Sequence, residues 1–431
     1  MKTEVTVFWF RRDLRLNDNI GLTEALKGSL PVLPVFIFDE EILSDLEDKF
    51  DKRVDFIHQA LEQLNKELNK FSSSLLVLQG KTKDVFNALT NDYHIRQVYC
   101  NTDYEPYAIQ RDNNIKQLLE KKGIPFNSFK DQVIFHKDDI VKDDGSPYTV
   151  FTPYSKKWKE NFFLSEFNAQ NNDIKNNFFS SSFEFPCLED IGFKKTEIKF
   201  KLPEMPDAEF LSKYSVDRNF PFLNGTSRLS THLRFGTISI RELVNHCLNK
   251  SESWLNELIW REFYMMILYH FPHVVTNCFK MKYDNIKWEN DELKFLAWRE
   301  GKTGYPIVDA GMRELNHTGY MHNRVRMITA SFLVKDLHVD WRWGEAYFAK
   351  KLLDFDLSAN NGGWQWSAGT GCDAAPYFRI FNPIEQQKKF DPDFNYVKKW
   401  VKEFGTNNYP EPIVDHAEAR KKTLALYKAV I

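Results

Sequence analysis

The sequence predicts two domains: an α/β domain with a doubly wound, Rossmann-like parallel sheet, and a mainly α-helical domain after it. Short apolar runs alternate with amphipathic stretches in the first part of the chain, whereas helical periodicity dominates from Ala208 onward. A chain of 431 residues is also long enough to build two separate cores. We therefore expect an α/β domain over residues 1–135, a connector over 136–206 and a helical domain over 207–431.

The apolar runs of the first part have the length and composition of buried strands. They are Val5–Phe10, Leu33–Phe38, Ser74–Gln79 and Gln97–Cys100. Stretches with apolar residues at helical spacing lie among them, namely Val54–Leu68, Thr82–Thr90 and Ile109–Lys122. This alternation indicates a parallel sheet covered by helices. The first run is followed by RRDLRLND rather than GxGxxG, so a dinucleotide in the usual crevice is not indicated.

The segment from Phe162 to Pro206 differs in composition from both neighbours. It is rich in Asn, Ser, Phe and Lys with scattered Pro, which indicates a long connection on the surface.

Charge and cysteine content exclude several classes of protein. A net charge of −2 argues against nonspecific coating of nucleic acid but leaves room for a local basic groove. The five cysteines show no CxxC or Cys/His spacing, so we expect no metal site and no disulfide framework. Arg11 and Arg12 interrupt the first apolar run too early for a signal peptide, and no run approaches the ~20 apolar residues of a membrane span. We expect a cytoplasmic protein without membrane contact.

The segment Asp354–Pro383 combines polar and aromatic side chains in an unusual way. It holds three carboxylates, paired asparagines, a double glycine, two tryptophans two residues apart and Arg379. A plain core segment would not need so many polar groups beside aromatic rings. Each group has a chemical use if the segment wraps a flavin and faces a flipped base.

The stretch GTSRLSTHLRFGTIS at Gly225–Ser239 offers several hydroxyls beside a glycine. Thr226, Ser227 and Ser230 can form an ordinary helix cap or an anion site at a helix start. From the residues alone the cap is favoured.

The stretch WLNELIWREFY at Trp254–Tyr264 places four functional side chains at i, i+3, i+4 and i+7, on one helical face. They are Glu257, Trp260, Arg261 and Tyr264. A solvated face seldom holds a tryptophan, and a core face seldom holds both an acid and a base, so this face indicates the wall of a pocket.

Five segments of this chain resemble segments of the photolyase/cryptochrome family and follow one another in the same order. They are the three segments described above, together with FWFRRDLRLNDN at Phe8–Asn19 and the segment Lys302–Leu337. The match is most specific to the class I cyclobutane pyrimidine dimer DNA photolyases, and it touches nearly the whole chain. The resemblance implies FAD in the helical domain and UV-damaged DNA as partner. It implies light-driven repair, in which photoexcited reduced FAD passes an electron to a flipped-out dimer. We expect a monomer.

The resemblance assigns roles to residues of this chain. The dimer contacts are Glu257, Trp260, Asn323, Met327 and Trp366. The FAD contacts are Tyr214, Thr226, Ser227, Arg228, Leu229, Ser230, Trp254, Arg261, Arg326, Asp354, Asp356 and Asn360. The electron-transfer chain is Trp288, Trp341 and Trp364, although each tryptophan taken alone reads as packing. The DNA-backbone contacts are Arg218, Arg324, Arg379 and Gln386.

Some matched positions separate the branches of the family. Asn360 matches the residue that faces flavin N5, and Arg326 is able to pair with Asp354, the acid beside the flavin ring. His322 is followed by Asn323, whereas the (6-4) branch has a second histidine there, so a cyclobutane dimer is the expected lesion.

Two questions stay open from the sequence. Ala108 and the pair Val274–Val275 replace the acid and the Cys-Lys pair that hold methenyltetrahydrofolate, so the antenna chromophore is uncertain. The alternative function is a cryptochrome-type blue-light photoreceptor; Asn360 and the absence of a long tail after the flavin segment favour repair. A thermal flavin oxidoreductase is disfavoured because the nicotinamide fingerprint is missing.

Overall fold

The computed structural model describes residues 3–164 and 176–430. The chain forms two compact units. The first comprises Met1–Asp139, Glu160–Met205 and Leu229–Leu248, and the second comprises Ile140–Lys159, Pro206–Arg228 and Asn249–Ile431. The units thus depart from the expected ranges, because 229–248 joins the first unit and 140–159 the second. Residues 165–175 of the expected connector lie outside the described residues.

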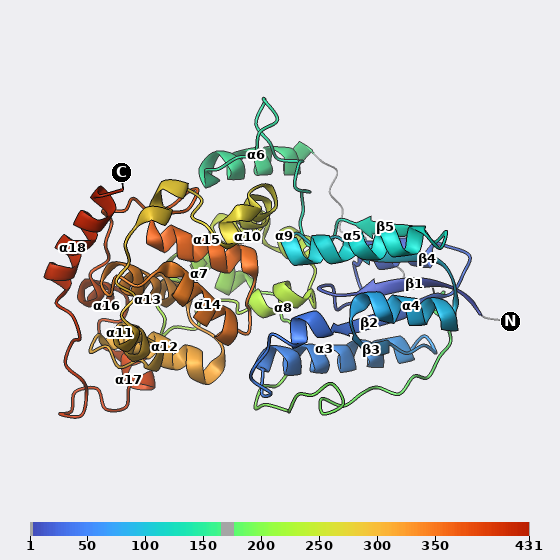
Figure 1. Cartoon of the computed structure of the whole chain (residues 1–431), viewed down its shortest axis with the longest axis horizontal. Coiled ribbons are helices and arrows are strands. Elements are labelled where there is room, and N and C mark those ends of the chain that lie inside the picture. Colours follow the sequence, from blue (N-terminus) through green and yellow to red (C-terminus); the bar gives the residue numbers. More distant parts are fainter. Residues whose placement is uncertain (1–2, 165–175, 431) are drawn as a thin grey trace. The chain divides into compact units, whose positions relative to one another are not determined.

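The first unit is built on a five-stranded parallel sheet in the order β3-β2-β1-β4-β5 (Figure 1). The strands are β1 (Glu4–Phe10), β2 (Val32–Asp39), β3 (Leu76–Gly80), β4 (His94–Asn101) and β5 (Phe126–Phe129). In the central strand Phe8 lies opposite Pro34 of β2 and Tyr99 of β4. The predicted doubly wound parallel sheet is confirmed. The short strand β5 was not predicted, because FNSF carries no sustained apolar run.

The helices of the first unit are α1 (Ile20–Leu26), α2 (Glu40–Leu43), α3 (Lys52–Asn69), α4 (Thr82–Asp92), α5 (Pro106–Glu120), α8 (Ser230–Phe235) and α9 (Ile240–Cys247). Side-chain caps start several of them, as where Asp51 accepts from the backbone N–H of Arg53 at 2.8 Å.

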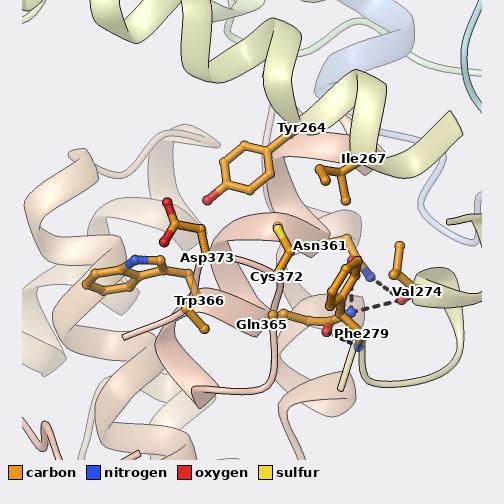
Figure 2. A pocket seen from close by; sticks show the side chains of 12 residues that line it. Tyr264, Ile267, Val274, Phe279, Asn361, Gln365, Trp366, Cys372 and Asp373 are labelled. Atoms are coloured by element: carbon orange, nitrogen blue, oxygen red, sulfur yellow. Dashed lines mark hydrogen bonds between the residues drawn. The ribbon is translucent and has the colours of Figure 1, made fainter. Parts of the chain in front are cut away.

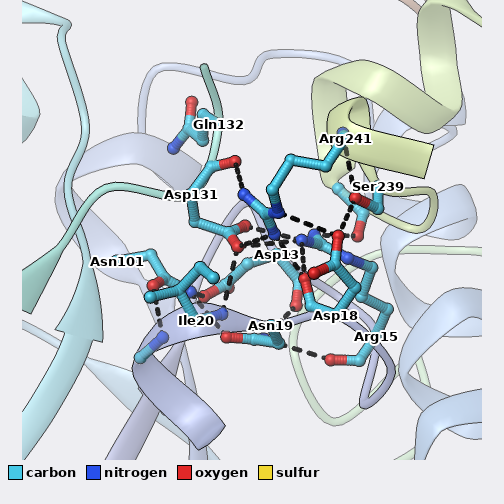
Figure 3. Close-up of polar contacts among 12 residues, drawn as sticks. Asp13, Arg15, Asp18, Asn19, Ile20, Asn101, Asp131, Gln132, Ser239 and Arg241 are labelled. Carbon is cyan, nitrogen blue, oxygen red and sulfur yellow. Dashed lines mark hydrogen bonds and ion pairs between the residues drawn. The ribbon is translucent and has the colours of Figure 1, made fainter. Parts of the chain in front are cut away.

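A buried ion-pair network joins α9 to the carboxyl edge of the sheet, within the first unit (Figure 3). The carboxylate of Asp131 accepts from Arg15 at 2.8 Å and from Arg241 at 2.7 Å, and Arg241 also donates to Asp18 at 2.8 Å. All four side chains are buried. Buried charges need such pairing, since removing one partner leaves the other uncompensated. The network fixes the segment that directly follows Gly225–Arg228 in the chain.

The second unit is helical, as predicted (Figure 1). Its elements are α6 (Phe151–Leu164, which begins in this unit), α7 (Ala208–Asp217), α10 (Glu252–His270), η1 (Pro272–Val275), η2 (Met281–Asn285), α11 (Glu292–Glu300), α12 (Pro306–Thr318), α13 (Asn323–Lys335), α14 (Trp341–Lys351), α15 (Leu357–Ala368), α16 (Pro383–Phe390), α17 (Asn395–Trp400) and α18 (His416–Lys428). None of the described helices is long and apolar enough to cross a membrane.

Helix α15 lies at the centre of this unit and packs against α10, α13 and α14. Two glycines permit these close approaches. A Cβ at Gly362 would lie 2.2 Å from the ring of Tyr264 on α10, and one at Gly344 on α14 would lie 2.0 Å from the ring of Trp364. Helices α10 and α13, which carry two of the matched motifs, therefore meet at α15.

Candidate functional site: a flavin and base-binding centre

The predicted pocket face of α10 forms an aromatic and charged wall. Trp260 lies 5.4 Å from Tyr264, ring centre to ring centre, and it also packs flat on Phe151 of α6. Trp254 is buried on the same helix. The aromatic rings and the acid of α10 therefore lie on one face of the helix, as their spacing in the sequence predicted.

Glu257 forms an ion pair with Arg218, which begins the loop after α7. The guanidinium of Arg218 also lies 5.6 Å from the ring centre of Tyr214. Burial raises the pKa of Glu257, and the charge of Arg218 opposes that rise. A predicted DNA contact and a predicted dimer contact are therefore paired here.

The start of α13 carries the predicted dimer and phosphate contacts. His322 caps the helix by accepting from the backbone N–H of Arg324 at 3.1 Å. The Arg324 guanidinium donates to Asn219 at 2.6 Å and lies 3.7 Å from the sulfur of Met327. Asn323 is the exposed first residue of the helix.

The predicted phosphate contacts form a basic region. Burial lowers the pKa of Arg324, and the positive charges of Arg218 and Arg379 lower it further. Gln386 is half-buried on α16. Such a cluster suits a backbone of phosphates, which position a nucleic acid without reading its sequence.

Two of the expected FAD contacts, Thr226 and Arg228, lie beside Tyr320, a residue that the sequence did not single out. The hydroxyls of Thr226 and Tyr320 lie 3.2 Å apart, and the guanidiniums of Arg228 and Arg326 lie 4.8 and 5.8 Å from the Tyr320 ring centre. Arg228 has a positive φ of 53°, which is uncommon for a residue other than glycine. Along the same segment Ser227 is half-buried, Leu229 buried and Ser230 exposed.

The expected pair of Arg326 and Asp354 is confirmed. Arg326 Nη2 donates to both carboxylate oxygens of Asp354, at 3.1 and 2.9 Å. Burial lowers the pKa of the Arg326 guanidinium, but the charge and the hydrogen bonds of Asp354 outweigh this effect and raise the pKa above its ordinary value. A guanidinium held by its carboxylate partner therefore lies beside the segment that leads into α15.

The amides of Asn360 and Asn361 are held in different ways. Asn360 donates to the carboxylate of Glu345 at 2.7 Å and to its backbone oxygen at 3.2 Å. Asn361 donates instead to the backbone oxygen of Val274 at 2.8 Å. The bonds to Glu345 leave the amide oxygen of Asn360 as the atom able to accept from an N–H. Asp356 caps α15 through the N–H of Ala359.

The donor set of these residues fits FAD. Hydroxyls and guanidiniums suit a diphosphate, whereas a carboxylate pair and an accepting amide suit the polar edge of an isoalloxazine. Among residues 3–164 and 176–430, no group of three His, Cys, Asp or Glu side chains is placed to hold a metal ion.

A pocket opens between α10, α15 and the loop Gly371–Ala374 (Figure 2). Tyr264 and Trp366 lie on either side of Asp373 in this view. The wall includes Gln365, whose amide donates to the backbone oxygen of Val274 at 3.1 Å. Trp366 is also one of the residues that line this pocket.

The predicted electron-transfer tryptophans lie on three elements. Trp364 and Trp341 are buried on α15 and α14, whereas Trp288 is half-buried, 6.1 Å from Tyr427. The tryptophan ring that contacts Trp364 is Trp298, at 6.1 Å between ring centres. The expected order, with Trp364 nearest the flavin, Trp341 intermediate and Trp288 outermost, stays a prediction.

His322 predicts a pH dependence of stability. Burial first, and then Arg326, Arg324 and Arg228, lower the pKa of His322 from 6.5 to about 4. The folded state therefore excludes a proton that the unfolded state binds, and stability falls as the pH drops from about 6.5 to about 4. His322→Asn keeps a capping side chain without this titration. Its unfolding free energy, measured by urea titration, should decline less over that window than the wild type's. Equal declines would contradict the assignment.

Comparison with known proteins agrees with this geometry. Residues 6–171 match the model of the DNA photolyase domain and residues 254–407 the FAD-binding domain of DNA photolyase. A deoxyribodipyrimidine photo-lyase from Synechococcus is 38% identical over 98% of this chain and 96% of its own.

Solved structures give the same result. A class III photolyase from Agrobacterium tumefaciens has a TM-score of 0.88 at 33% identity, covering 100% of this chain and 98% of its own. An archaeal photolyase from Sulfolobus tokodaii, solved with two FAD molecules, has a TM-score of 0.86 at 38% identity, covering 99% and 100%. With this similarity over its whole length, the chain belongs to the photolyase/cryptochrome family.

Proposed function

We propose that this chain is a light-driven deoxyribodipyrimidine photo-lyase that repairs cyclobutane pyrimidine dimers in UV-damaged DNA. The observation that supports it best is the convergence of the matched cofactor and dimer residues on α10, α13 and α15, in a chain similar to photo-lyases throughout. We further propose that it acts as a monomer in the cytoplasm.

Each group of residues has a role that follows from its chemistry. The basic region of Arg218, Arg324 and Arg379 holds the phosphates, and Trp260 and Trp366 stack on the flipped bases. Glu257 hydrogen-bonds the base edge. Flipping a damaged pair costs less than flipping a normal one, which contributes to selectivity. FAD, when bound, supplies the photoexcited electron; the Arg326–Asp354 pair and Asn360 hold its ring and its charge.

A survival assay tests the function in cells. Expression in a bacterium that lacks photo-lyase and excision repair should raise survival after ultraviolet exposure only if blue light follows. Equal survival in light and darkness would count against repair and favour the alternative, a photoreceptor.

Substitution of Glu257 should separate chemistry from cofactor binding. Glu257→Ala removes the carboxylate that bonds the base edge, so the yield of repaired dimers per absorbed photon should fall. FAD should stay bound, because Glu257 is assigned to the dimer. The checks are flavin absorbance and dimer repair on the same sample; loss of FAD would move Glu257 to the cofactor site.

The antenna positions predict weak folate binding. Ala108 is a buried residue of α5 without a carboxylate, and Val274 and Val275 supply neither thiol nor amine. Protein mixed with methenyltetrahydrofolate should show little near-ultraviolet absorbance beyond the flavin. A stoichiometric folate band that survives gel filtration would refute this expectation.

A further inference from the structure

Helix α6 contacts α10 through several side chains in the second unit. Phe151 packs on Trp260, and Lys159 forms an ion pair with Glu252 at 2.7 Å. The association has a buried polar anchor as well, since Trp158 Nε1 donates to Glu262 at 2.7 Å. The first turn of α6 is therefore fixed against the face of α10 that carries Trp260.

Phe151 packs flat on Trp260. Their ring centres are 3.6 Å apart and their planes differ by 5°, which is close face-to-face contact. Phe263 meets both rings edge-on, at 5.9 and 5.6 Å. The backbone N–H of Phe151 donates to Asp373 at 2.9 Å, so the backbone that carries the ring is fixed too. One side of the Trp260 indole is thereby covered by a ring that cannot move freely.

We propose that Phe151 is a positioning residue of the damage pocket: it fixes the plane of Trp260 so that the indole is already oriented to stack on a flipped base. An unsupported indole would have to be ordered when DNA binds, and that loss of side-chain freedom lowers affinity. A fixed ring avoids this cost. The inference rests on the proposed function, because it takes Trp260 as the stacking residue.

The positioning role of Phe151 is tested by measuring DNA binding in the dark. Phe151→Leu removes the ring and keeps an apolar side chain, whereas Phe151→Tyr keeps the ring. Phe163→Leu is the matched control, because Phe163 is on the same helix but 63% exposed. Each purified protein is titrated with an oligonucleotide that holds one thymine dimer and with the undamaged oligonucleotide, and its flavin content is measured.

Phe151→Leu should weaken binding of the dimer oligonucleotide about fivefold, the scale of ordering one side chain on binding, with undamaged binding and FAD content unchanged. Phe151→Tyr and Phe163→Leu should both bind as the wild type does. If Phe151→Leu loses FAD, the same binding comparison is made with Phe151→Met, whose side chain fills a similar space.

Three results would overturn the inference. Unchanged dimer binding by the ringless variant would make Phe151 a packing residue. Tighter binding would mean that Phe151 occupies the place of the base. Equal weakening on both oligonucleotides would place the effect outside stacking. A wild type that does not discriminate the dimer would refute the proposed function instead, so the two failures are distinguishable.

Discussion

Replacing Trp364 with Phe should nearly abolish photoreduction of oxidised FAD while leaving repair by chemically reduced enzyme intact. Phenylalanine keeps the shape of the buried site but is much harder to oxidise than tryptophan, so the first step of electron transfer fails. The repair electron does not use this path, because it passes between flavin and dimer. The measurement pairs flavin bleaching under blue light, with a thiol donor, against dimer repair after dithionite reduction.

Trp298 provides the control for this experiment. Its ring packs on Trp364 at 6.1 Å, and its indole N–H donates to the backbone oxygen of Thr329 at 3.1 Å. We interpret it as packing, so Trp298→Phe should photoreduce normally. Undiminished bleaching in Trp364→Phe would remove Trp364 from the path, and loss of FAD with both activities would make it structural.

Trp260→Ala should weaken binding of dimer-containing DNA by about tenfold or more. The variant loses a base–aromatic stack, worth ~1–3 kcal/mol, and leaves the face of Phe151 without its partner. The phosphate contacts remain, so affinity for undamaged DNA should change little. Titration of both oligonucleotides measures this; a variant that binds the dimer as the wild type does would show that the pocket is wrongly placed.

The architecture could be predicted from the sequence because its signals are local. Alternating apolar runs predicted four of the strands, and β1 and β2 differ from the predicted runs by a residue or two at their ends. The division of the chain into two units was harder to predict from the sequence. Residues 229–248 join the sheet unit through Arg241, whose partners Asp18 and Asp131 are far away in the chain, and no local pattern announces that network.

The same limit applies to the site. The spacing of Glu257 and Trp260 predicted a shared face, and the pairing of Arg326 with Asp354 was anticipated from their chemistry. The bonds from Asn360 to Glu345 were not, since the two residues lie on different helices and no local spacing joins them. Tyr320 lay inside a recognised motif, but its place between Arg228 and Arg326 joins distant segments of the chain, so no local pattern singled it out.

Loss of thymine dimers from irradiated duplex DNA is the measurement that tests the central claim most directly. The purified, FAD-loaded protein is reduced with dithionite, mixed with the DNA and divided between blue light and darkness. The account predicts that dimers disappear and intact thymines return only in the illuminated sample. Dimers that persist under light, with reduced flavin present and DNA bound, would contradict it.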